Sequence, residues 1–267
     1  MLLNIKHQTS YSYERPVNYG LQQLRLLPKT RTEQEVITWS TSVEGAKEEL
    51  TFHDHHNNHV TMISVADGAR QITITSQGQV RTSDTNGVIG EHSGFAPLWY
   101  FAEGTPLTRA GNLTRQLVKG MNAELPDELE RMHALSKRVR DAVEWTVGET
   151  NVTTTGEQAL GEGRGVCQDH AHIFCAGART LGLSARYVSG YLATQEDEVH
   201  DAAHAWAEAY IAGLGWVGFD ISNGISPDER YVRVATGRDY RDAAPVSGIS
   251  FGDHGGEKLS VAIQVQQ

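Results

Sequence analysis

Hydrophobic and polar residues alternate along the first third of the chain, in short runs separated by turn residues. Neighbouring side chains of a strand point to opposite faces, so such runs are typical of strands with one buried face. The runs cover residues 3–13, 21–28, 34–43, 59–66 and 70–80. We therefore predict an N-terminal antiparallel β-sandwich or sheet over residues 1–84, ending before a stretch rich in Gly, Asn and Ser.

Helical periodicity replaces this alternation in residues 95–150. The apolar residues of one segment recur three or four positions apart, and Pro126-Asp127 marks the start of its helix; they are Leu129, Met132, Leu135, Val139 and Val143. These helices are predicted to lead into a second domain, 85–267, with its core at 151–248. Renewed alternation predicts a final strand at 258–267. The predicted fold class is α+β.

Composition and charge narrow the class of protein. The chain has 267 residues, of which 39% are hydrophobic and 21% charged, as in globular proteins that bury a core. The formal net charge is −10, without a cluster of Lys and Arg, which disfavours nucleic-acid and anionic-membrane partners. The chain shows neither a secretory signal pattern nor an apolar run of membrane-spanning length, so the cytoplasm is the expected compartment.

A glycine-rich turn delivers Cys167 to the start of a helix predicted over residues 166–181. Unpaired N–H groups and the helix dipole favour an anion there, which lowers the pKa of a thiol from its free value of roughly 8.5. Cys175 lies eight residues further along the same helix, too far away for a disulfide, and is expected in the core. Cys167 is therefore the candidate nucleophile.

Downstream residues supply partners for this cysteine. A strand predicted over residues 185–193 is followed by an acidic loop, 195–202, and by strict alternation over 203–211. The alternation places four residues on one face: His204, Trp206, Glu208 and Tyr210. A three-residue hairpin loop, 212–214, leads into the next strand.

The register of this hairpin decides whether a carboxylate reaches His204. If Ile211 opposes Gly215, Asp220 lies one diagonal step from His204 on the same face, at roughly 7–8 Å between backbone positions. A loop one residue longer or shorter would place the two on opposite faces. Cys167, His204 and Asp220 are thus the predicted nucleophile, base and orienting carboxylate.

These motifs together resemble the transglutaminase-like superfamily, in particular its bacterial branch with an N-terminal β-domain. The resemblance rests on GVCQDHAH, LGLSARYVSGYL, HAWAEAYIAGLGWVGFD and GRDYRDAAPVSG, and on YSYERPVNYGLQQLRLLPKT near the start. It implies a papain-like triad in which a helix carrying Cys167 packs on an antiparallel sheet carrying His204 and Asp220. The step from Cys167 to His204 is far shorter than the roughly 130–150 residues found in papain itself.

Further residues are candidates for binding substrate. The backbone N–H of Cys167 is one expected oxyanion donor. Gln158 is a candidate second donor, because relatives of this fold contribute an amide in that region, or else a plain loop glutamine. Tyr191 and Trp206 are candidate walls of a substrate channel or, alternatively, core aromatics. The histidine-rich segment 53–59 could bind zinc or form a turn without a ligand; no metal or cofactor is expected.

The sequence predicts a cysteine acyl-transfer enzyme that acts on peptide or amide bonds. Hydrolysis, as in a peptidase or amidase, is favoured by analogy with bacterial members of the family. Transfer to an amine, as in a transglutaminase, would use the same residues. Two alternatives from other classes are an inactive peptide-binding module and a metal-binding protein built on residues 53–59. The sequence does not predict an oligomeric state.

Overall fold

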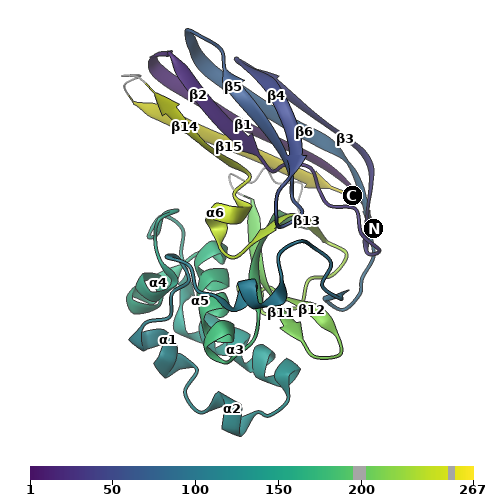
Figure 1. The fold of residues 1–267 in the computed structure, drawn as a ribbon, viewed down its shortest axis with the longest axis vertical. Coiled ribbons are helices and arrows are strands. Elements are labelled where there is room, and N and C mark those ends of the chain that lie inside the picture. The colour runs from purple at the N-terminus through teal and green to yellow at the C-terminus, as the bar shows by residue number, and fades with distance from the viewer. Residues whose placement is uncertain (195–202, 252–255) are drawn as a thin grey trace.

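The computed structural model describes residues 1–194, 203–251 and 256–267. A β-sandwich lies on one side of the molecule, and an α+β core lies on the other (Figure 1). The α+β class predicted from the sequence is confirmed. The predicted acidic loop, 195–202, lies outside the described residues.

The sandwich consists of two four-stranded antiparallel sheets, with the orders β15-β1-β6-β3 and β14-β2-β5-β4. Its strands are β1 (Leu2–Val17), β2 (Tyr19–Leu24), β3 (Gln34–Glu44), β4 (Ala46–His53), β5 (His59–Val65), β6 (Ala69–Thr82), β14 (Val246–Phe251) and β15 (Glu257–Gln266). Apolar side chains from both sheets fill the space between them, among them Tyr11, Leu24, Ile63, Ile72 and Ile74. The alternation read from the sequence therefore predicted the buried face correctly.

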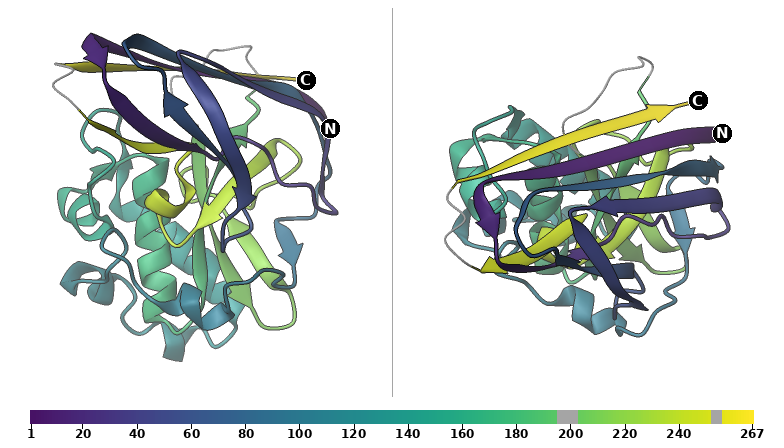
Figure 2. Two further views of the ribbon diagram at one scale, coloured as in Figure 1. Left: turned by 45° about the horizontal axis from the view of Figure 1, so that its top comes forward. Right: turned by 90° about the horizontal axis from the view of Figure 1, so that it is seen from above.

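β14 and β15 belong to the sandwich, whereas the sequence analysis assigns residues 85–267, which include both strands, to the second domain. β14 pairs antiparallel with β2, and β15 pairs with β1 from Asn4 opposite Gln266 to Tyr13 opposite Glu257. Figure 2 shows β1 and β15 side by side, with the two chain ends close together. The physical reason is that alternating apolar residues of β15, such as Ile263 and Val265, bury one face against Leu3 and Ile5.

The core is built on a five-stranded sheet of order β13-β10-β11-β12-β7. Its strands are β7 (Val88–Gly90), β10 (Ala185–Leu192), β11 (His204–Ile211), β12 (Gly215–Phe219) and β13 (Tyr231–Gly237). Helices and short elements complete it: η1 (Leu98–Ala102), α1 (Asn112–Leu117), α2 (Met121–Glu124), α3 (Glu128–Ala142), β8 (Glu144–Trp145), α4 (Gly156–Glu162), β9 (Arg164–Gly165), α5 (Cys167–Thr180) and α6 (Tyr240–Ala243). Within the described residues, no helix is long and apolar enough to cross a membrane.

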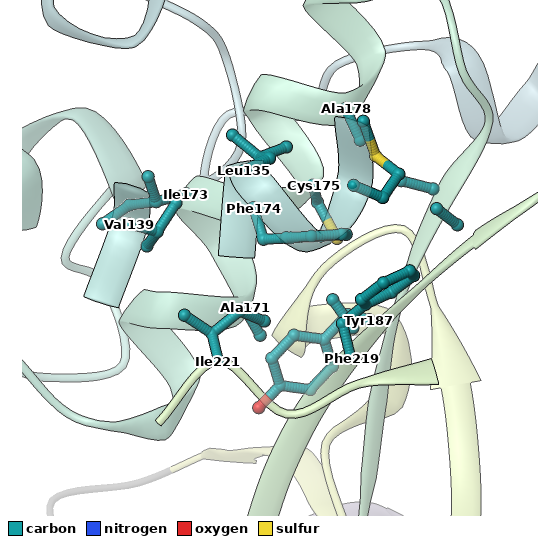
Figure 3. Close-up of a cluster of buried hydrophobic side chains, with 14 of the residues drawn as sticks. Leu135, Val139, Ala171, Ile173, Phe174, Cys175, Ala178, Tyr187, Phe219 and Ile221 are labelled. Atoms are coloured by element: carbon teal, nitrogen blue, oxygen red, sulfur yellow. The ribbon is translucent and has the colours of Figure 1, made fainter. Parts of the chain in front are cut away.

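Helix α5 is buried along most of its length because α3 covers one side of it and the sheet covers the other. Figure 3 shows Phe174 between Leu135 of α3 and Phe219 of β12. The rings of Phe174 and Phe219 are stacked with 5.1 Å between their centroids. The helix is therefore apolar on several faces and is fixed in place by packing, which holds its N-terminus still.

A mixed apolar and polar interface joins the sandwich to the core. Leu3 and Ile263 of the sandwich share one buried cluster with Tyr191 and Val232 of the core. The Gln34 side chain pairs with the backbone of Arg233, donating to its carbonyl at 2.8 Å and accepting from its N–H at 2.7 Å. The two parts are thus held at a fixed distance across the edge of β13.

Replacing Ile263 by Ala tests the docking of β15. Because Ile263 is 2% exposed in the apolar cluster, its truncation should lower the free energy of unfolding by about 2–5 kcal/mol in urea. Gln264→Ala, one residue on, is the control and should change stability by less than about 0.5 kcal/mol. Equal effects of the two substitutions would show that β15 is not docked on β1 in solution.

Candidate active site

Cys167 is the first residue of α5 and follows a tight turn. Gly163 ends α4 with a left-handed φ of 67°, and a Cβ on Gly165 would lie 2.8 Å from the side chain of Asp169. The Asp169 carboxylate accepts hydrogen bonds from the Val166 N–H at 2.9 Å and the Thr150 hydroxyl at 2.7 Å. This turn fixes Cys167, which is partly exposed, at the positive end of the helix.

His170 joins α5 to the segment that follows β12. Its Nε2 donates to the Val143 carbonyl at 3.0 Å, so its Nδ1 accepts from the Ser222 hydroxyl at 2.7 Å. Burial lowers the pKa of His170, which keeps the ring neutral in this role. Ser222 lies two residues after Asp220, so this contact ties α5 to the segment that carries Asp220. The sequence analysis did not identify it, because the partners are far apart in the chain.

His204 begins β11, and Asp220 directly follows β12. Ile211 lies opposite Gly215 and Ala207 opposite Phe219, which confirms the register predicted from the three-residue loop. As a result, His204 Nε2 and Asp220 Oδ2 are 2.6 Å apart. The Asp220 side chain is 0% exposed, so the bond is sealed from solvent on the carboxylate side.

Two side chains that the sequence analysis did not identify complete the shell of Asp220. The Tyr231 hydroxyl and Asn223 Nδ2 each donate to Oδ2 at 2.7 Å, and the Asn223 N–H donates to Oδ1 at 3.1 Å. Burial raises the pKa of Asp220, but the bond with His204 and these donors outweigh burial and hold the pKa below its usual range. The carboxylate is therefore ionised at neutral pH.

His204 also interacts with Cys167. Because Nε2 is bonded to Asp220, Nδ1 is the ring nitrogen left for Cys167. Burial lowers the pKa of His204, but the hydrogen bonds to Asp220 and Cys167 and their charges raise it to about 10. The structure thus brings together the three residues that the sequence singles out, with a positively charged imidazole in the middle.

Cys167 and His204 open onto a cavity of about 810 Å³ between the sandwich and the core. Tyr191 lines this cavity, as expected, and its hydroxyl lies 2.9 Å from Nδ1 of His7 on β1. The sandwich supplies eight lining residues: His7, Thr9, Tyr11, Val246, Leu259, Val261, Ile263 and Val265. The N-terminal domain, to which the sequence analysis assigns no chemistry, is therefore one wall of the candidate active site.

Two predicted substrate residues lie away from this cavity. Gln158 is exposed on α4, where its Oε1 accepts from the N–H and the hydroxyl of Thr155, each at 2.9 Å. These bonds form a helix capping box, which explains a glutamine at that position. Trp206 is 3% exposed and packs against the His204 ring with 6.2 Å between centroids. It supports the imidazole, and neither residue is among the described lining residues.

The histidines of segment 53–59 have separate partners. His53 and His59 face each other across the β4–β5 hairpin, with 5.5 Å between ring centroids. His55 Nε2 lies 3.1 Å from the Tyr100 hydroxyl, and His56 Nε2 lies 3.2 Å from Asp242 Oδ2. In the part of the chain that the structure describes, no three His, Cys, Asp or Glu residues gather as metal ligands would.

Full-length relatives of this chain include mycobacterial proteins. An uncharacterized protein of Mycobacterium leprae is 29% identical over 280 residues, covering 98% of both chains. An uncharacterized protein of Mycobacterium tuberculosis is 27% identical over 288 residues, covering 98% of this chain and 91% of the relative. The similarity therefore extends over the sandwich and the core together.

A solved structure shares the fold of this chain, and two family models match its sequence. A crystal structure described as that of a putative cysteine protease from Cytophaga hutchinsonii covers 100% of this chain, and 90% of its own chain is covered. Its TM-score is 0.78 at 21% sequence identity, so the likeness shows a shared fold. Residues 3–81 match the bacterial transglutaminase-like N-terminal region, and residues 115–221 match the transglutaminase-like superfamily. This chain thus belongs to the transglutaminase-like superfamily and carries the N-terminal region of its bacterial branch.

Proposed function

We propose that this protein is a cysteine acyl-transfer enzyme that cleaves peptide or amide bonds. Cys167 is the nucleophile, His204 the acid and base, and Asp220 the group that orients His204. The observation that carries the proposal is the arrangement of Cys167 beside His204, whose Nε2 is hydrogen-bonded to the buried Asp220, at the wall of a large cavity. A structural cysteine needs neither the imidazole nor the cavity.

In the first step, the Cys167 thiolate attacks the carbonyl carbon of the substrate amide. A C–S bond forms, and the carbonyl π electrons move to the oxygen, where the Cys167 N–H at the start of α5 stabilises the charge. His204 Nδ1 then gives its proton to the amide nitrogen, and the C–N bond breaks to leave a thioester. Asp220 holds the imidazole in place and stabilises its positive charge.

In the second step, an acceptor releases the acyl group. His204, now neutral, takes a proton from water, whose oxygen attacks the thioester and expels the Cys167 thiolate. We propose water as the acceptor because the analogy with bacterial relatives favours hydrolysis. An amine would follow the same path and give a new amide. Mass analysis of products formed with and without added methylamine distinguishes the two.

Iodoacetamide should modify Cys167 of the folded protein faster than it modifies a small free thiol, because Cys167 lies at the N-terminus of α5 beside the His204 imidazolium. Cys175 is the internal control: it is fully buried, and burial raises its pKa to about 11. Mass mapping of both peptides across pH gives the two rates. If Cys167 reacts no faster than a small free thiol, His204 does not activate it, and the inactive peptide-binding module becomes the better hypothesis.

Asp220→Asn should lower kcat for amide hydrolysis by about 10²- to 10⁴-fold. Because Asp220 raises the pKa of His204, its loss lowers that pKa. Protonated His204 is needed to expel the amine, so the alkaline limb of kcat/KM should move to lower pH.

The matched control for this carboxylate is Asp228→Asn, which disturbs a partly exposed ion pair with Arg230. Its pH profile should stay that of the unmodified protein, while Cys167→Ala gives the background rate. An Asp220→Asn enzyme with normal kcat and an unmoved alkaline limb would exclude Asp220 as the orienting residue.

A further inference from the structure

The described residues that line the cavity beside Cys167 carry no formal charge apart from the candidate catalytic residues. Among the described residues that line it, none is Asp, Glu, Lys or Arg, although the chain contains 33 acidic and 23 basic residues. His7, the other histidine of the lining, adds no charge at neutral pH, because burial lowers its pKa to about 4. A charged substrate group would lose its hydration here without gaining a counter-ion.

The sandwich residues that line the cavity form its roof. The polar side chains of His7 and Thr9 there are hydrogen-bonded within the protein. His7 Nδ1 lies 2.9 Å from the Tyr191 hydroxyl, and His7 Nε2 lies 3.1 Å from the Thr9 hydroxyl. These groups satisfy one another's hydrogen bonds within the protein. They therefore present a largely neutral surface to whatever enters, rather than a row of unpaired donors.

The β15 strand supplies an aliphatic ridge to the same roof. Its cavity residues alternate along the strand and face three residues of β1: Leu259 lies opposite Tyr11, Val261 opposite Thr9, and Ile263 opposite His7. Alternation in a strand sends the residues between them to the opposite face. The face of β15 that lines the cavity is thus apolar from Leu259 to Val265.

Exposed apolar residues continue this surface at the edge of the cavity. Trp145, Val147 and Val152 are 57%, 67% and 54% exposed on the segment that follows α3, and Leu259 is 54% exposed on β15. Large apolar side chains that gather around one opening mark a binding surface in soluble proteins. A ligand longer than a single residue would cover them.

We propose that the acyl donor of this enzyme is an uncharged, apolar segment whose aliphatic or aromatic side chain packs beneath β15, so that the sandwich selects the substrate. The identity of the reacting bond rests on the proposed function. The preference itself is a property of the cavity and does not need turnover. The substrate class is therefore peptides or amides with apolar, neutral acyl parts, in contrast to acidic or basic ones.

The test uses two alkylating reagents that share an iodoacetamide warhead and a six-carbon chain. N-hexyl iodoacetamide ends in a methyl group, and 6-(iodoacetamido)hexanoate ends in a carboxylate. Each rate at Cys167 of the full chain is divided by the rate of the same reagent with N-acetylcysteine. The hexyl reagent should be favoured about tenfold or more, because its chain is removed from water beneath β15. Equal normalised rates would overturn the proposal.

Val261→Lys should weaken or abolish this preference, because the ammonium attracts the carboxylate tail and repels no part of the warhead. Its ratio of hexyl to carboxylate rates should fall about tenfold, with a gain for the carboxylate reagent. Ala262→Lys is the matched control, since Ala262 is exposed and does not line the cavity. Equal ratios in the two variants would contradict the role given to β15.

Two further measurements, the modification of Cys175 and the turnover of amides, distinguish the possible outcomes. Cys175 must stay unmodified in each variant, which reports an intact core; if Val261→Lys fails this check, Leu259→Lys at the exposed edge replaces it. Alkylation requires no catalysis, so a protein that shows the tail preference but hydrolyses no amide would contradict the proposed function alone. Turnover of amides with Asp or Lys acyl groups as fast as those with Leu or Phe would contradict the apolar preference alone.

Discussion

The buried carboxylate of Asp220 is the constraint on which the arrangement of this site depends. Burying a charged group costs folding free energy unless hydrogen-bond donors surround it. Here His204, Tyr231 and Asn223 all donate to the Asp220 carboxylate. His204 comes from β11 and Tyr231 from β13, and the carboxylate itself follows β12. Satisfying one charge thus aligns the ends of three strands, and the same bonds charge the imidazole that faces Cys167.

The parts of the site that sequence reasoning predicted are those set by local geometry. The position of Cys167 at a helix start follows from a glycine turn and a helical pattern, and both are confirmed. The juxtaposition of His204 and Asp220 follows from a three-residue loop and period-two alternation, because together they leave a single register. These rules act over a few residues, so they can be read without knowing the rest of the fold.

The parts that were missed depend on partners distant in sequence or on exposed segments. No sequence pattern predicts the hydrogen bonds that Tyr231 and Ser222 make. β4 was not predicted because it lacks alternation: it is exposed along almost all of its length and has three consecutive charged residues, as suits the edge of a sheet. Of the alternatives for Gln158, the sequence could not choose, because a glutamine that caps a helix and one that donates to an oxyanion look alike without coordinates. The alternation of β15 predicted a strand but could not indicate which sheet would receive it.

The pairing of β15 with β1 gives the N-terminal domain a role that follows from topology. The chain begins on β1, builds the core, and returns to lie beside its own first strand, so residues from both ends close over Cys167. Ile263 and Val265 belong at once to the cluster that joins sandwich to core and to the lining of the cavity. Because the same side chains stabilise the fold and face the substrate, a polar substitution there carries a cost in stability. This coupling favours an apolar roof, and with it an apolar substrate, whatever chemistry the core performs.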